Sequence, residues 1–289
     1  MRFAASTMLA LLVLAPELGA QNASDTILDR QIRTTQAATR ALASTTAAHA
    51  AGFEPVFGWI PTMGVHWVNN ERMAKGKAFE LTAPAQLMFS PIGGRDSLVG
   101  AAYAYLAPVG DSSRPTTFAG DPPWHEHPNL APPGQTLVML HVWFVPSPGG
   151  PFAGHNHNLP FWAVGLTPPN ADRLRHPMIG PRIRKTAFVL AEVADTTGLF
   201  PVLAAREPAR TKLRALRDSV RALIPSFASA DSANDWPRWD AAAERAASLW
   251  DEFRATYLDA VLVPTRRPRV ERLMDDMVRG AHDSTHRHP

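Results

Sequence analysis

The sequence contains no cysteine at any of its 289 positions. Disulfide bonds, thiolate metal sites, covalent haem attachment and cysteine nucleophiles are therefore excluded. Any metal ion must be held by nitrogen and oxygen ligands. Charged residues are scarce, at 19% of the chain, whereas proline is abundant, with 27 residues. Together with a hydrophobic content of 45%, this composition predicts long proline-bearing loops around an ordered centre rather than helices throughout.

No stretch after the first 20 residues is apolar enough to span a bilayer. The N-terminus, MRFAASTMLALLVLAPELGAQNAS, instead has the parts of a secretory signal peptide. Arg2 supplies a positive charge, residues 8–15 form a short apolar run, and Leu-Gly-Ala precedes Gln21 as a cleavage site. We expect residues 1–20 to be a signal peptide and the mature protein to be soluble and periplasmic or secreted. A retained anchor is the alternative, but the run is about half the length of a spanning helix.

Motifs that would assign a common reaction are also missing. The sequence has no G-x-S-x-G, no G-x-G-x-x-G and no Walker loop, so a serine hydrolase or a nucleotide-binding enzyme is not supported. The net charge of +3 comes from arginines spread over the second half, without a dense basic stripe interleaved with aromatics. We therefore expect no nucleic-acid partner.

The distribution of apolar and turn-forming residues divides the chain into segments. We expect an N-terminal helix in residues 21–51, a β-rich domain with clustered histidines in residues 52–169, a helical region in residues 170–281 and a disordered tail in residues 282–289. The predicted fold class is α+β, with an antiparallel sheet or barrel-like central domain followed by a helical C-terminal segment. We see no internal repeat.

Short apolar runs bounded by glycine and proline predict the strands of the central domain. These runs lie at residues 65–68, 86–89, 97–106 and 136–145. In the C-terminal region, RHPMIGPRIRK suggests an extended loop and TAFVLAEVA fits either a strand or a helix. Beyond Pro208, apolar residues recur at steps of three and four, which predicts amphipathic helices. Asp235 is placed to cap the longest of them, with Pro237 in its first turn.

Histidines are concentrated in the β-rich segment. HEH contains His125 and His127, and HNH contains His155 and His157. Two residues apart on an extended backbone, paired imidazoles project to the same side. His141 lies within the apolar run TLVMLHVWFV, where an unpaired polar group costs about 1–3 kcal/mol.

His66 lies in the apolar stretch VHWV, so that six histidines are candidate ligands in all. They suggest a transition-metal site, with Zn, Cu, Fe or Mn as the ion. Glu126, between the first two, is a candidate ligand or general base beside a metal-bound water. The alternative for each histidine is a neutral ring whose nitrogens are satisfied by nearby groups.

Four segments share their order with a family of exported bacterial proteins of unknown function. They are TMGVHWVN, PAQLMFSPIGGRDSLVGAAYAY, PTTFAGDPPWHEH and MLHVWFVPSPGGPFAGHN, within about residues 62–160. This part resembles the family pattern of a Met-Gly-x-His start, an LVGxEY strand and a final LHxWxWxxNPxGxF. The resemblance implies export and singles out His66, His141 and Asn156, with His125 and His127 in some members. Ala102 stands where the pattern has Glu, which puts a shared activity in question.

Two functions follow from these features. The first is metal binding in an exported β domain, with the reaction open. The second is a non-catalytic interaction or scaffold subunit, in which the C-terminal helices dock to a protein partner or to a second copy of the chain. The deciding feature is whether the rings of His66, His125, His127 and His141 meet in space.

Overall fold

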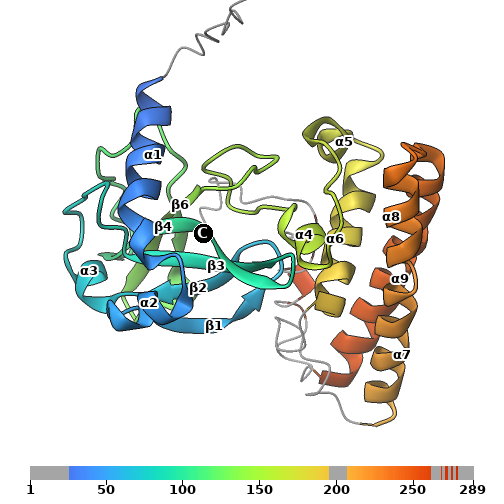
Figure 1. The fold of residues 1–289 in the computed structure, drawn as a ribbon. Helices are drawn as coiled ribbons and strands as arrows, with labels where there is room; N and C mark the ends of the chain where they lie inside the picture. Colours follow the sequence, from blue (N-terminus) through green and yellow to red (C-terminus); the bar gives the residue numbers. More distant parts are fainter. Residues whose placement is uncertain are drawn as a thin grey trace, which may run out of the picture.

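The computed structural model describes residues 26–194 and 207–261, and also Pro268, Glu271, Arg272, Asp275 and Val278. The expected signal peptide and the expected disordered tail lie outside the described residues. The described part has an antiparallel sheet in its N-terminal half and helices in its C-terminal half, as Figure 1 shows. The predicted α+β class is therefore confirmed. No helix in this part of the chain is both long and apolar enough to cross a membrane.

The strands β1 to β6 lie between residues 54 and 143, and short helices separate some of them. In order, the elements are α1 (Ile27–Thr39), a 3-10 turn (Arg40–Leu42), α2 (Thr45–Ala50), β1 (Glu54–Ile60), β2 (Gly64–Val68), α3 (Asn70–Ala74), β3 (Gln86–Ile92), β4 (Arg95–Pro108), β5 (His125–His127), a second 3-10 turn (Pro128–Leu130), β6 (Gln135–Trp143), α4 (Leu159–Ala163), α5 (Ala171–Arg175), α6 (Gly180–Ala194), α7 (Ala209–Arg221), α8 (Ile224–Ser232) and α9 (Trp236–Val261).

The sheet has six strands in the order β1-β2-β3-β4-β6-β5, and every neighbouring pair is antiparallel. It is open, since β1 and β5 lie at its two edges, so of the two predicted forms the sheet is observed and not the barrel. All four predicted runs form strands. Strand β1 was not predicted, because its segment EPVFGWI contains Pro55 and Gly58, and both residue types are depleted in strands.

The N-terminal segment covers one face of the sheet (Figure 1). A capping box between Thr26 and Asp29 starts α1. The hydroxyl of Thr35 lies 2.9 Å from the hydroxyl of Tyr103 on β4, which ties the helix to the sheet. The single helix expected here is interrupted, because the Ser44 side chain accepts from the Ala47 amide and starts α2 as a separate helix.

The C-terminal helices bury their apolar stripes on one another. Residues of α6, α7, α8 and α9 share one hydrophobic core, with Trp239 and Trp250 among its fully buried side chains. Asp235 accepts a hydrogen bond from the Arg238 amide at 3.1 Å, which confirms the predicted cap. The extended loop expected for RHPMIGPRIRK is wrong in its second half, where α6 begins at Gly180. Ile183 is fully buried in the shared core, and this burial favours the helix.

The turn between β1 and β2 requires glycine at position 64. Gly64 has φ +75°, and a Cβ atom there would lie 2.5 Å from the carbonyl oxygen of Phe89 on β3. Gly64→Ala is therefore expected to destabilise the protein by about 2–3 kcal/mol in urea unfolding. Gly76→Ala is the matched control, because Gly76 has φ +64° with no atom within 4 Å of its Cβ position. A loss of about 1 kcal/mol is expected for the control. Equal losses for the two variants would contradict this account.

Candidate functional site

Four histidines lie on one face of the sheet, opposite the face that α1 covers. Directly paired residues of antiparallel strands share a face. His66 on β2 pairs with Met88 on β3, and Met88 pairs with Gly100 on β4. Two residues along, Gln86 pairs with Ala102, which pairs with His141 on β6. His66 and His141 therefore share a face although two strands separate them.

The HEH pair extends this face beyond β6. His125 pairs with Met139, and His127 pairs with Leu137. Because Met139 is two residues from His141, both imidazoles of β5 lie on the same side of the sheet as His141. The inference from the spacing of HEH, that its two rings share a side, is confirmed by ring centroids 4.9 Å apart.

The four rings meet in space. The Nε2 atoms of His66 and His141 share a hydrogen bond at 3.3 Å, in which one ring donates and the other accepts, and their ring centroids are 5.4 Å apart. The ring centroid of His125 is 5.0 Å from that of His141. His127 is near enough to act electrostatically on His66. The cluster joins strands whose key residues are 75 positions apart in the sequence.

Small residues on β4 make this meeting possible. Gly100 lies in the cross-strand row of His66, and Ala102 lies in the row of His141. Neither residue bears a long side chain. A Cβ atom at Gly100 would lie 2.5 Å from the Met88 methyl group and 2.6 Å from the Val142 carbonyl oxygen. The space above Gly100 is therefore occupied by Met88 and Trp143, whereas the small methyl group of Ala102 leaves room above β4 for the ring of its partner His141.

Burial keeps the His66 ring uncharged. His66 is 6% exposed and His141 is 1% exposed. The pKa of His66 is lowered to about 4, mainly by burial and secondly by the electrostatic effect of His127, whereas a hydrogen bond with the Gly64 backbone acts in the opposite direction. At neutral pH the His66 ring is therefore neutral, which is the form that binds a metal ion.

The nitrogen positions are close to those of a metal site without forming one. Two nitrogens bound at about 2.0–2.1 Å to a tetrahedral ion lie roughly 3.3–3.4 Å apart, and the His66 and His141 nitrogens are separated by 3.3 Å. Nevertheless, within residues 26–194 and 207–261 no three His, Asp or Glu side chains are arranged to hold an ion. Completing a site requires the β5 imidazoles to bring a nitrogen to this pair.

Gln86 is a polar residue of this face that the sequence analysis did not single out. It is 2% exposed, and its amide oxygen accepts no hydrogen bond from any described residue. Gln86 lies on β3 between His66 and His141 in the order of the strands. Its only sequence signal is a polar residue at the start of the apolar run QLMF.

The HNH pair makes different contacts. His155 Nδ1 lies 2.6 Å from the hydroxyl of Thr62, in the turn between β1 and β2. The rings of His155 and His157 are 6.0 Å apart, and His157 is 6.2 Å from the ring of Phe188 on α6. Asn156, which is fully buried, donates its amide to the Pro146 carbonyl at 3.1 Å. These contacts place the pair at the junction between the sheet and the C-terminal helices.

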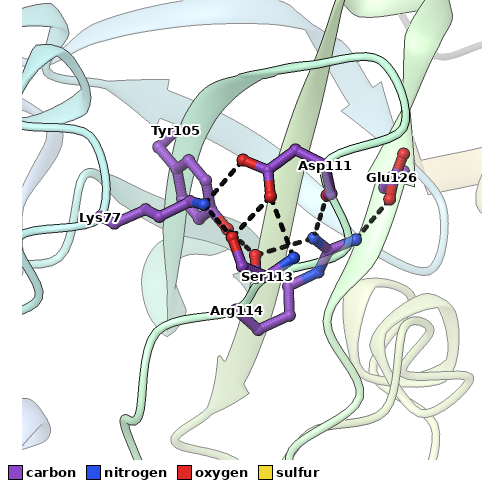
Figure 2. Close-up of polar contacts among 6 residues, drawn as sticks. All are labelled: Lys77, Tyr105, Asp111, Ser113, Arg114 and Glu126. Carbon is purple, nitrogen blue, oxygen red and sulfur yellow. Dashed lines mark hydrogen bonds and ion pairs between the residues drawn. The ribbon is translucent and has the colours of Figure 1, made fainter.

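Glu126 lies on the other side of β5 from its two neighbours, because side chains alternate along a strand. Its carboxylate forms an ion pair with Arg114. Arg114 also donates to the carbonyl oxygen of Asp111 at 2.7 Å, and Lys77 binds the Asp111 carboxylate at 2.7 Å. Hydrogen bonds from Lys77 and Ser113 lower the pKa of Asp111. Figure 2 shows this network, which fixes the connection between β4 and β5 and so the position of the HEH strand.

Glu126→Gln is expected to leave metal affinity within about twofold of the wild type, because Glu126 faces Arg114 rather than the rings. The glutamine side chain retains an oxygen for Arg114, and an exposed ion pair contributes only about 0–1 kcal/mol. Metal titration followed by calorimetry measures this, with thermal unfolding as the check on folding. A loss of binding in a folded variant would restore Glu126 as a ligand.

Comparisons of the chain with protein-family models, with curated proteins and with solved structures found no match. The interpretation of the site therefore depends on its geometry.

Proposed function

We propose that the sheet face formed by β2, β6 and β5 binds one transition-metal ion through His66, His141 and the imidazoles of His125 and His127. The observation that carries the proposal is the 3.3 Å separation of two buried Nε2 atoms, with a third ring centroid 5.0 Å from His141. At this separation the two nitrogens can bind one ion together once the shared proton is lost.

The ligand chemistry selects among ions. Neutral imidazoles suit Zn, Cu and Fe, whereas Mn prefers oxygen ligands, so the first three fit the four rings best. A cluster of neutral ligands leaves the charge of a divalent ion uncompensated, which favours an additional solvent-derived ligand such as hydroxide.

Elemental analysis tests the proposal directly. The full-length protein, produced without a histidine tag, is expected to contain about one equivalent of a single transition metal, and the variant His125→Ala/His127→Ala is expected to contain much less. A metal content below about a tenth of an equivalent, with no rebinding after dialysis against zinc, would reject metal binding. Full retention in the double variant would move the ligands to other residues.

We also propose that the protein is exported, on the strength of the signal-like residues 1–20. Fractionation of expressing cells, with N-terminal sequencing of the exported form, tests this, and Gln21 is the expected first residue. The scaffold interpretation has less support, because the apolar stripes of α6, α7 and α9 are buried within the chain itself. A monomeric mass in analytical sedimentation would contradict docking of the C-terminal helices to a second copy of the chain.

A further inference from the structure

The amide oxygen of Gln86 is a buried acceptor on the same face of the sheet as the imidazoles. Gln86 pairs with Ala102, and Ala102 pairs with His141, so these three residues form one row across β3, β4 and β6. The middle residue of the row, Ala102, has only a methyl side chain. Gln86 therefore faces the same space above β4 as the two imidazoles that meet there.

A buried amide in this position requires an explanation. Buried polar side chains nearly always find a hydrogen-bond partner, and the residues that flank Gln86 in the sequence, Ala85 and Leu87, are apolar. Its exposed fraction is 2%, and no described residue donates to its oxygen. An acceptor oxygen without a protein donor beside a cluster of metal-binding nitrogens suits a donor that arrives with the metal ion, namely a bound water molecule.

We propose that Gln86 is a positioning residue for a water or hydroxide bound to the metal, so that the centre has histidine ligands and one exchangeable position. This inference depends on the proposed metal site. The metal-bound oxygen donates one hydrogen bond to the Gln86 amide oxygen. The four proposed ligands are imidazoles and include no carboxylate, so the bound ion keeps a net positive charge. This charge favours a solvent ligand that small anions can replace.

Exchange of the bound water for an anion predicts the direction in which a change at Gln86 alters azide affinity. Azide displaces the bound water, which leaves as a neutral molecule, and azide has no hydrogen to donate to Gln86. In the wild type, azide binding therefore breaks the hydrogen bond to the amide oxygen. Gln86→Met keeps the side-chain length but removes the acceptor, so azide is expected to bind more tightly, by a factor on the order of ten.

Cobalt(II) is the probe, because its visible spectrum reports on coordination number and on ligand exchange. The cobalt-loaded full chain is titrated with azide, in the wild type and in Gln86→Met. Thr136→Val is the matched control, since Thr136 on β6 is also buried, at 1% exposure, and its hydroxyl also has no partner among the described residues. Its neighbour Leu137 pairs with His127, so Thr136 faces the other side of the sheet. The control should bind azide as the wild type does.

The possible results separate the two proposals. Cobalt binding with azide affinity equal in the wild type and in Gln86→Met overturns the role of Gln86 and leaves the metal site standing. A cobalt spectrum that azide does not change also overturns it, because the coordination is then closed. Failure of the wild type to bind cobalt overturns both. Equal tightening in Gln86→Met and Thr136→Val would assign the effect to packing and reject the inference.

Discussion

His141→Ala is expected to lower the affinity for zinc by about 100-fold or more, the largest functional effect of any single substitution in this chain. His141 is the central ring of the cluster, since it contacts His66 through the two Nε2 atoms and His125 through its ring. Removing it eliminates one ligand and separates the β2 imidazole from the β5 imidazoles. Competition titration with a chromogenic chelator measures the affinity.

His49→Ala is the control for this substitution. His49 lies on α2, where its ring pairs with Glu54 at the protein surface. The same change of residue there should leave zinc affinity unaltered. If His49→Ala and His141→Ala weakened binding equally, the zinc would be held at scattered surface histidines. Thermal unfolding of both variants in EDTA separates loss of a ligand from loss of the fold.

The stability of the metal-free protein is expected to fall as the pH is lowered from about 6.5 to about 4. His66 has a pKa of about 4 in the folded protein, mainly because it is buried, and about 6.5 when unfolded. Between these values the unfolded chain binds more protons at His66, so protonation favours unfolding. The contribution is complete above pH 6.5 and is lost toward pH 4, and the difference corresponds to about 3 kcal/mol.

Urea unfolding in EDTA between pH 4.5 and 7.5 measures this slope. His127 and His141 face His66, so the informative quantity is the difference in slope between the wild type and His66→Gln. The variant should show the shallower dependence on pH. Identical slopes would mean that His66 is already satisfied as a cation in the folded state, contrary to the effect of its burial.

The sequence alone predicted much of the sheet but not the arrangement of the site. Apolar runs bounded by turn formers located β2, β3, β4 and β6, because local patterning determines strands that are buried. The alternation in HEH correctly placed His125 and His127 on one side of a strand. The order of the strands in the sheet depends on tertiary contacts, which local patterning does not reveal. The order β2-β3-β4-β6-β5 is what brings His66 toward His141.

Other features had no clear local signal. Ala102 is an unremarkable small residue in the sequence, yet its single methyl group leaves the space in which the rings meet. Gln86 became a candidate only when the register placed it on the same row as His141. Glu126 illustrates the reverse case, since its position in HEH suggested chemistry whereas the pleat of β5 directs it to Arg114.

The position of β5 links ion occupancy to the outer margin of the sheet. This strand has three residues, pairs only with β6 and supplies two of the four imidazoles. This margin is already held by its pairing with β6 and by the ion pair of Glu126 with Arg114. An ion shared between β5 and the interior strands would add a further tie, so metal supply would set how often the exposed border opens to another chain.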